Sequence, residues 1–141
     1  MPEIIADHNQ NQENGDAVTA FLMQHSDAAN QPWNPVPYAF TLMDGDRICG
    51  GLMGNVNRGW AYVAVLAVDE KLRGQGWGEK LMAQAEAWAI ENNCAGIWLD
   101  TFSFQAPKFY KKLGFTEFGS LPNFPDDQTR HFFKKELIQV P

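Results

Sequence analysis

The sequence has little cysteine and no long apolar run, and each shortage excludes a class of protein. Cys49 and Cys94 lie far apart without metal-ligand spacing, so neither a disulfide framework nor a cysteine metal site is expected. No apolar run approaches the roughly 20 residues needed to cross a bilayer, and the amino terminus lacks a basic region followed by an apolar stretch. We therefore expect a cytoplasmic protein with no membrane contact.

Positive charge is also scarce. The chain has 11 lysines and arginines against 17 acidic residues, a formal net charge of -6, and its cations are scattered rather than gathered in one stripe. Such a chain repels phosphate backbones, so nucleic acid is excluded as a partner. The same balance suits a cationic small molecule or a basic peptide.

The 141 residues are 45% hydrophobic and 13% aromatic, which is enough for one sizeable core. We therefore expect a single domain over residues 1–141. Hydrophobic periodicity and turn residues predict, in chain order, a short strand at 2–7, a helix at 17–26 capped by Asp16, strands at 38–43, 47–56 and 60–68, a helix after residue 78, a strand at 97–102, a short helix at 107–113, and strands at 115–120 and 129–138. This order predicts an α/β or α+β fold with a mixed sheet flanked by helices.

Glycines interrupt the expected middle strand. Gly50, Gly51 and Gly54 weaken it as a simple ladder and indicate either a bulge or a face that another group approaches closely.

A second group of glycines precedes the amphipathic helix, in the stretch "RGQGWG" from Arg73 to Gly78. The first turn of a helix presents N–H groups without intrahelical partners, and glycines let an anion approach them closely. We expect Gln75 and Trp77 to point away while Arg73 adds a positive charge, an arrangement suited to a pyrophosphate. The stretch lacks the Gly-Lys-Ser/Thr of a P-loop and the spacing of the dinucleotide fingerprint.

Two blocks of sequence carry a resemblance to a known family. "LAVDEKLRGQGWGEKLM" is similar to the acetyl-coenzyme A motif of the GCN5-related N-acetyltransferases (GNAT family), with Arg73, Gly76 and Gly78 at its defining positions. "SFQAPKFYKKLGF" resembles the family's later segment at Ala106, Tyr110, Gly114 and Phe115. The resemblance covers the chain from about residue 17 and implies a mostly antiparallel central sheet of six to seven strands.

The resemblance also implies a cosubstrate and residues that bind it. Acetyl-CoA would be used without a metal, and Tyr110 would donate a proton to the departing thiolate. Ser103 stands where the family usually has Asn, which implies a weaker or water-mediated hydrogen bond to the cosubstrate. The residues expected to contact acetyl-CoA are Leu66, Val68, Arg73, Gly74, Gln75, Gly76, Trp77, Gly78, Ser103 and Tyr110.

The base that deprotonates the amine is not identified by the motifs. The strand 60–68 has no carboxylate, although many family members use one there. Asp100 is the first candidate for the base and His131 the second. Each also has a structural alternative: Asp100 could cap the turn after its strand, and His131 could be an exposed strand residue. Trp33, on a proline-rich loop, and Tyr38 are predicted to line the acceptor pocket, although Trp33 fits the edge of the core equally well.

The resemblance implies direct attack by a primary amine on acetyl-CoA in a ternary complex, with backbone N–H groups of a bulged strand stabilising the developing negative charge. One alternative is a CoA-binding module without catalysis, which the missing strand carboxylate favours and Tyr110 opposes. Another is a protein or peptide N-acetyltransferase, with an open acidic groove. Family members are often dimers, so a homodimer is also allowed.

Overall fold

The computed structural model describes residues 1–137 and divides the chain into two compact units, Met1–Asn34 and Pro35 onward. Ile138, the last residue of the final predicted strand, lies outside the described residues. Within residues 1–137, no helix combines the length and the apolar character that a membrane crossing requires.

The first unit contains one helix, α1 (Gln12–Ala28), where the sequence predicts one at 17–26. The predicted cap is wrong, because the helix begins upstream of Asp16 and the side chain of Asn11 accepts the N–H of Asn14 instead. The strand predicted at 2–7 is also wrong. This segment has no regular secondary structure. Its apolar side chains Ile4 and Ile5 are exposed, so it does not bury an apolar face against a neighbouring strand.

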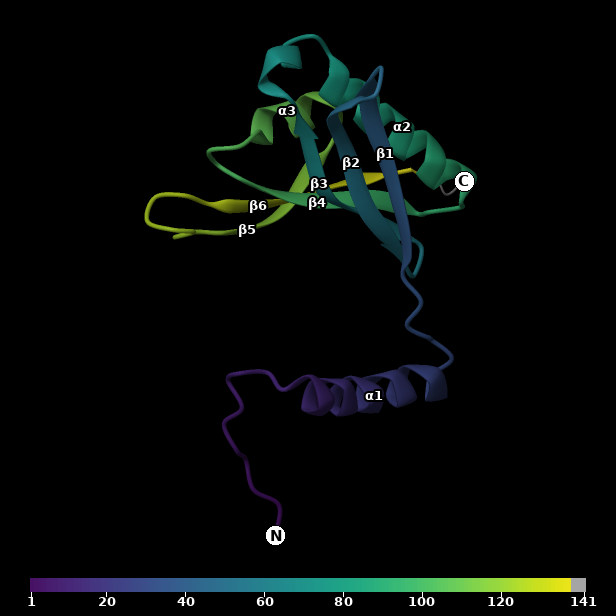
Figure 1. Ribbon diagram of the computed structural model, residues 1–141, viewed down its shortest axis with the longest axis vertical. Helices are drawn as coiled ribbons and strands as arrows, with labels where there is room; N and C mark the ends of the chain where they lie inside the picture. Colours follow the sequence, from purple (N-terminus) through teal and green to yellow (C-terminus); the bar gives the residue numbers. More distant parts are fainter. Residues whose placement is uncertain (138–141) are drawn as a thin grey trace. The chain divides into compact units, whose positions relative to one another are not determined.

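The second unit contains a six-stranded sheet, as the sequence predicts (Figure 1). The strands are β1 (Val36–Asp44), β2 (Arg47–Asn57), β3 (Trp60–Val68), β4 (Gly96–Phe102), β5 (Thr116–Leu121) and β6 (Arg130–Glu136). They lie in the order β1-β2-β3-β4-β6-β5. Only β3 and β4 are parallel, so the sheet is mixed and mostly antiparallel.

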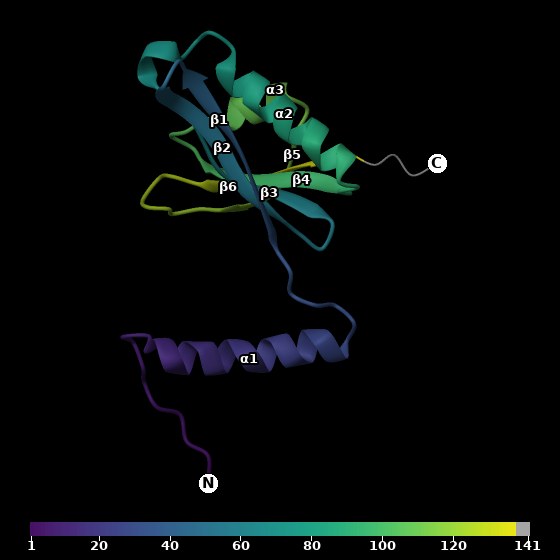
Figure 2. The same cartoon turned by 45° about the vertical axis from the view of Figure 1, so that its right-hand side comes forward.

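Two helices, α2 (Trp77–Glu91) and α3 (Pro107–Lys112), pack on the same face of this sheet (Figures 1 and 2). The amphipathic character predicted for the helix after residue 78 is confirmed in α2. Four of its residues are buried against the sheet: Leu81, Met82, Ala85 and Ala89. They share one core cluster with Ile97, Leu99 and Phe133 of the strands and with Tyr110 of α3.

The parallel pair β3–β4 is short, and this opens the sheet. Pairing runs only from Trp60–Val63 on β3 and Gly96–Leu99 on β4, whereas β3 stays paired with β2 as far as Val68. The register between β2 and β3 shifts at Gly54, leaving Ala64 as the extra residue of a bulge. A Cβ at Gly54 would lie 1.8 Å from the Tyr62 carbonyl oxygen, so only glycine fits there.

Candidate active site

A groove of about 1150 Å³ opens where β3 and β4 separate. One wall is the second half of β3, and the other is formed by β4 and α3. The loop before α2 lines one end, and Asp100, Thr101 and Gln105 lie in the same groove. The gap thus joins the two sequence motifs, which lie on opposite sides of β4 in the chain.

The loop before α2 has the backbone chemistry of an anion site. Gly76 is the N-cap of α2 and supplies no side-chain cap, unlike Asn11 of α1, so the first-turn N–H groups remain available. Gly74 and Gly76 have φ values of 77° and 83°, a conformation that favours glycine. A Cβ at either position would meet nothing within 4 Å. The loop is therefore open to a ligand.

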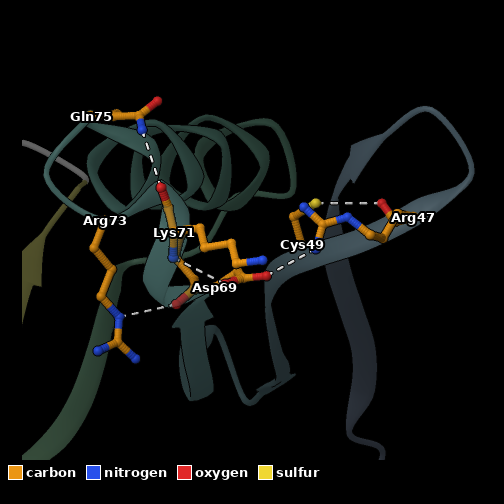
Figure 3. Close-up of polar contacts among 7 residues, drawn as sticks. Arg47, Cys49, Asp69, Lys71, Arg73 and Gln75 are labelled. Carbon is orange, nitrogen blue, oxygen red and sulfur yellow. Dashed lines mark hydrogen bonds and ion pairs between the residues drawn. The ribbon is translucent and has the colours of Figure 1, made fainter.

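Hydrogen bonds hold this loop in shape (Figure 3). Arg73 Nε donates to the Val68 carbonyl oxygen at 3.2 Å, which leaves its terminal nitrogens for a phosphate. Asp69 caps the short 3-10 helix η1 (Glu70–Leu72) by accepting the Lys71 N–H at 3.0 Å, and it pairs with Arg47 at 3.0 Å. The Lys71 backbone bond, followed by Arg47, lowers the pKa of Asp69.

The two residues expected to point away from the loop behave differently. The Gln75 amide donates back to the Lys71 carbonyl oxygen at 3.4 Å, as expected for a side chain outside the site. Trp77 is the first residue of α2 and is among the residues that line the groove, and the Lys80 ammonium lies 4.3 Å from its ring centroid. The orientation expected for its side chain stays a prediction.

Tyr110 lies in the groove with its ring fixed on the core side. It is only 8% exposed and makes an edge contact with Phe115 at 5.9 Å between centroids. Burial, with a further contribution from Asp100, raises the pKa of Tyr110 to about 12. The phenol is therefore protonated at neutral pH, as a proton donor must be.

Asp100 lies on β4 just past the last pair with β3, at the point where the groove opens. Its Oδ2 accepts from the Arg130 guanidinium at 2.8 Å and from the Tyr62 hydroxyl at 3.3 Å. Neither partner was expected from the sequence, because the three residues come from three strands and only the sheet order brings them together. The structure thus places Asp100, the first candidate for the base, at the groove, where it forms an ion pair with Arg130.

His131 and Ser103 lie outside the residues that line the groove. They form a chain of polar contacts, in which Ser103 Oγ lies 3.1 Å from His131 Nε2 and His131 Nδ1 contacts Glu117. Ser103 Oγ also accepts the Thr129 N–H at 3.1 Å. This chain ties the turn after β4 to the β5–β6 pair.

Gln105 is a groove residue that the sequence analysis missed. Its Oε1 accepts the Phe102 N–H at 2.9 Å and the Thr101 hydroxyl at 3.1 Å. Because a backbone N–H can only donate, the orientation of this amide is fixed. Its Nε2 has no hydrogen-bond partner within residues 1–137, so the groove has a fixed amide that can donate to a ligand.

The two residues predicted for the acceptor pocket lie in different units. Tyr38 lies in the core instead of the groove, because its ring stacks on Trp88 at 4.7 Å between centroids and its hydroxyl donates to the Tyr62 carbonyl at 3.0 Å. Trp33 belongs to the first unit, and its role stays a prediction. Within residues 1–137, no three His, Cys, Asp or Glu side chains are grouped so that they could hold a metal ion.

Comparisons with known proteins agree with this geometry. The Acetyltransferase (GNAT) family matches residues 7–115. A blasticidin-S acetyltransferase of Streptomyces morookaense is 41% identical over 106 residues, which cover 73% of this chain and 78% of that protein. The crystal structure of an acetyltransferase from Bacillus cereus superposes with a TM-score of 0.86 and 29% identity, over 96% of this chain and 98% of that one.

A third comparison includes a bound ligand. A protein assigned as a streptothricin acetyltransferase from Bacillus anthracis, solved with acetyl coenzyme A, is 30% identical with a TM-score of 0.66, over 73% of this chain and 64% of that one. With the open glycine loop, the separated strands and the groove in place, these matches define the class. The chain belongs to the GNAT family of acetyltransferases and uses acetyl-CoA.

Proposed function

We propose that this acetyltransferase transfers the acetyl group to a small cationic amine by direct attack in a ternary complex. The observation that carries the proposal is the single groove that contains the glycine loop, Tyr110 and Asp100. The residues needed to bind the cosubstrate, protonate a leaving group and accept an amine proton share one space.

The phosphate end of the groove would bind the cosubstrate. Open N–H groups at the start of α2 and the terminal nitrogens of Arg73 would bind the diphosphate. Backbone groups of β3 between Leu66 and Val68, past the point where β4 leaves it, would bind the extended arm. The Val68 carbonyl oxygen also accepts from Arg73 Nε, which fixes Arg73 beside this part of β3. Bound acetyl-CoA supplies the acetyl thioester.

Tyr110 would donate a hydrogen bond to the departing sulfur. A free thiol has a pKa of about 8.5, whereas that of Tyr110 is raised to about 12. Full proton transfer from the phenol is therefore uphill. Its main contribution is a fixed O–H donor that stabilises negative charge, while the proton that finally neutralises the thiolate comes from the amine.

Asp100 would accept the proton that a cationic amine must lose before it attacks, directly or through a water. The second amine proton, released as the C–N bond forms, neutralises the thiolate. It is the base candidate that lies in the groove, and its carboxylate attracts a cationic acceptor before the reaction. Arg130 and Tyr62 hold the carboxylate in place. His131, bonded to Ser103 outside the groove lining, would support the turn after β4.

The acceptor would be an amine of the kind that the names of the related enzymes contain. Blasticidin S and streptothricin are the substrates in their names, and a net charge of -6 suits a cationic amine of this kind. Trp33 would contribute to acceptor selection, and the reaction would take place in the cytoplasm. A basic peptide is the second acceptor class, and a homodimer is compatible with each of these roles.

Release of free thiol from acetyl-CoA tests this function across a panel of blasticidin S, streptothricin, aminoglycosides and basic peptides. We expect small amines to stimulate turnover, and Tyr110→Phe to lower it about tenfold or more while binding acetyl-CoA normally. Stimulation by peptides alone would contradict the proposed acceptor. Binding without turnover for every amine would instead favour a CoA-binding module.

A further inference from the structure

Nine of the eleven lysines and arginines of this chain fall into two groups. Some form ion pairs with carboxylates: Arg47, Arg130, Lys134 and Lys135. Others form no ion pair within residues 1–137 and lie at the start of α2 or on α3: Arg73, Lys80, Lys108, Lys111 and Lys112. In a protein with a net charge of -6, cations without acidic partners beside one groove indicate an anionic ligand.

Only two of these cations line the groove, Arg73 on the loop before α2 and Lys112 at the end of α3. They lie on different elements, so two separate anionic groups of one ligand can be bound. CoA has two such groups, the diphosphate and a phosphate monoester on the 3′ carbon of its ribose. The loop N–H groups and Arg73 already suit the diphosphate.

A packing contact brings Lys112 near the phosphate loop. A Cβ at Gly78, in the first turn of α2, would lie 3.4 Å from the ring of Phe109 on α3. The two helices therefore touch at this turn, which Figures 1 and 2 show as α3 beside α2. Lys112 lies three residues after Phe109, on the same side of α3. Its four-carbon side chain can therefore reach a phosphate beside the loop.

We propose that Lys112 binds the 3′-phosphate of CoA and so distinguishes CoA from its 3′-dephospho form. This inference rests on acetyl-CoA as the cosubstrate. The structural alternative is that Lys112 serves only the carboxyl end of α3, where a cation is favourable. Lys111 occupies the same last turn without lining the groove, so it experiences that effect alone and is the matched control.

Equilibrium binding of CoA and 3′-dephospho-CoA, measured by isothermal titration calorimetry on the full-length protein, tests the proposal without relying on turnover. We expect the wild-type protein to bind CoA about threefold to tenfold more tightly than dephospho-CoA, since the contact is charge-assisted but exposed. Lys112→Ala should abolish this preference by weakening CoA alone. Lys112→Glu should reverse it, and Lys111→Ala should leave it unchanged.

Several results would overturn the proposal. Equal weakening of both ligands by Lys112→Ala would assign Lys112 to the diphosphate, a pattern we expect for Arg73→Ala. Equal loss of preference in Lys111→Ala would show that the field of α3 is responsible. If the wild-type protein binds neither ligand, the CoA site itself is wrong. If it binds both equally, the cosubstrate assignment stands and the role of Lys112 fails.

Discussion

The two ends of the groove are built in different ways. At the end where we propose that the diphosphate binds, consecutive residues from Arg73 to Gly78 form the loop, and two of them have the positive φ angles that open it. At the reacting end, Asp100 has partners from β3 and β6, and Tyr110 comes from α3. One end is therefore a property of the local backbone, and the other is a property of the sheet order.

This difference predicts separable effects of substitution. Changes in the loop should alter cosubstrate affinity through backbone conformation, whereas changes at Asp100 and its partners should alter turnover with little change in affinity. If substitutions at either end changed affinity and turnover together, this division would be contradicted.

The largest effect is expected for Asp100→Asn. A positioned base contributes on the order of a hundredfold or more, so kcat should fall by about that factor while CoA affinity stays within about twofold. Steady-state kinetics and calorimetry with the amine found in the acceptor panel measure both quantities. Arg130→Gln is the control, because it breaks the same ion pair and keeps the carboxylate. Equal losses of turnover in both variants would reduce Asp100 to a structural role.

Gly76→Ala should have the next largest effect, at the other end. Its φ of 83° lies in the left-handed region, where alanine costs about 1–2 kcal/mol. Relief of that strain moves the loop, so the Kd for CoA should rise about fivefold to thirtyfold. The matched control is Gly59→Ala in the β2–β3 turn, with the same φ and no atom within 4 Å of a new Cβ. If both variants bind CoA normally, the loop conformation is not what selects the ligand.

The pH dependence of stability in alkaline solution distinguishes the two ends of the groove independently, and the expected effect is smaller. The pKa of Tyr110 is raised to about 12 from a usual value of 10.0, mainly by burial, so the folded state holds this proton more tightly than the unfolded state. The resulting stability is fully present below about pH 10 and is lost as the pH rises to about 12. Tyr110→Phe should therefore show a shallower loss of unfolding free energy over that interval, measured by urea denaturation.

The control for the alkaline measurement is a change in the loop. Gly76→Ala should lower stability by a similar amount at every pH, because it removes no titrating group. Tyr38→Phe should act like Tyr110→Phe, since burial also raises the pKa of Tyr38 to about 12, although this ring lies outside the groove. Parallel pH curves for the wild-type protein and Tyr110→Phe would contradict the assigned burial.

The contrast between the two ends also explains what the sequence could predict. Strand and helix periods predicted β1 to β6, α2 and α3. The glycine loop was predictable because its chemistry is contained in adjacent residues. The contacts of Asp100 with Tyr62 and Arg130 were not, since the first depends on β3 pairing with β4 and the second on β6 inserting between β4 and β5. No local pattern encodes that insertion.

Two of the errors have different origins. Asp16 failed as a cap because the helix extends beyond its apolar pattern, to a cap at Asn11. Tyr38 was predicted in the acceptor pocket, but its ring is buried in the core, where it stacks on Trp88 of α2. The first error is local, because polar residues extend the helix beyond its apolar repeat. The second concerns a contact with a distant element, which composition and spacing do not determine.

The smallest effect is expected for Ser103→Ala, which tests whether the polar chain at His131 belongs to the reacting end. Ser103 Oγ accepts the Thr129 N–H at 3.1 Å and contacts His131 at 3.1 Å, yet neither Ser103 nor His131 lines the groove. Loss of these exposed bonds should cost about 0.5–1.5 kcal/mol of unfolding free energy. Turnover and CoA affinity should change less than about threefold, since that bond energy is not spent on the ligand. His131→Asn should behave in the same way. If turnover in His131→Asn fell as far as in Asp100→Asn, the base would be His131 rather than Asp100. The reacting end of the groove would then include β6.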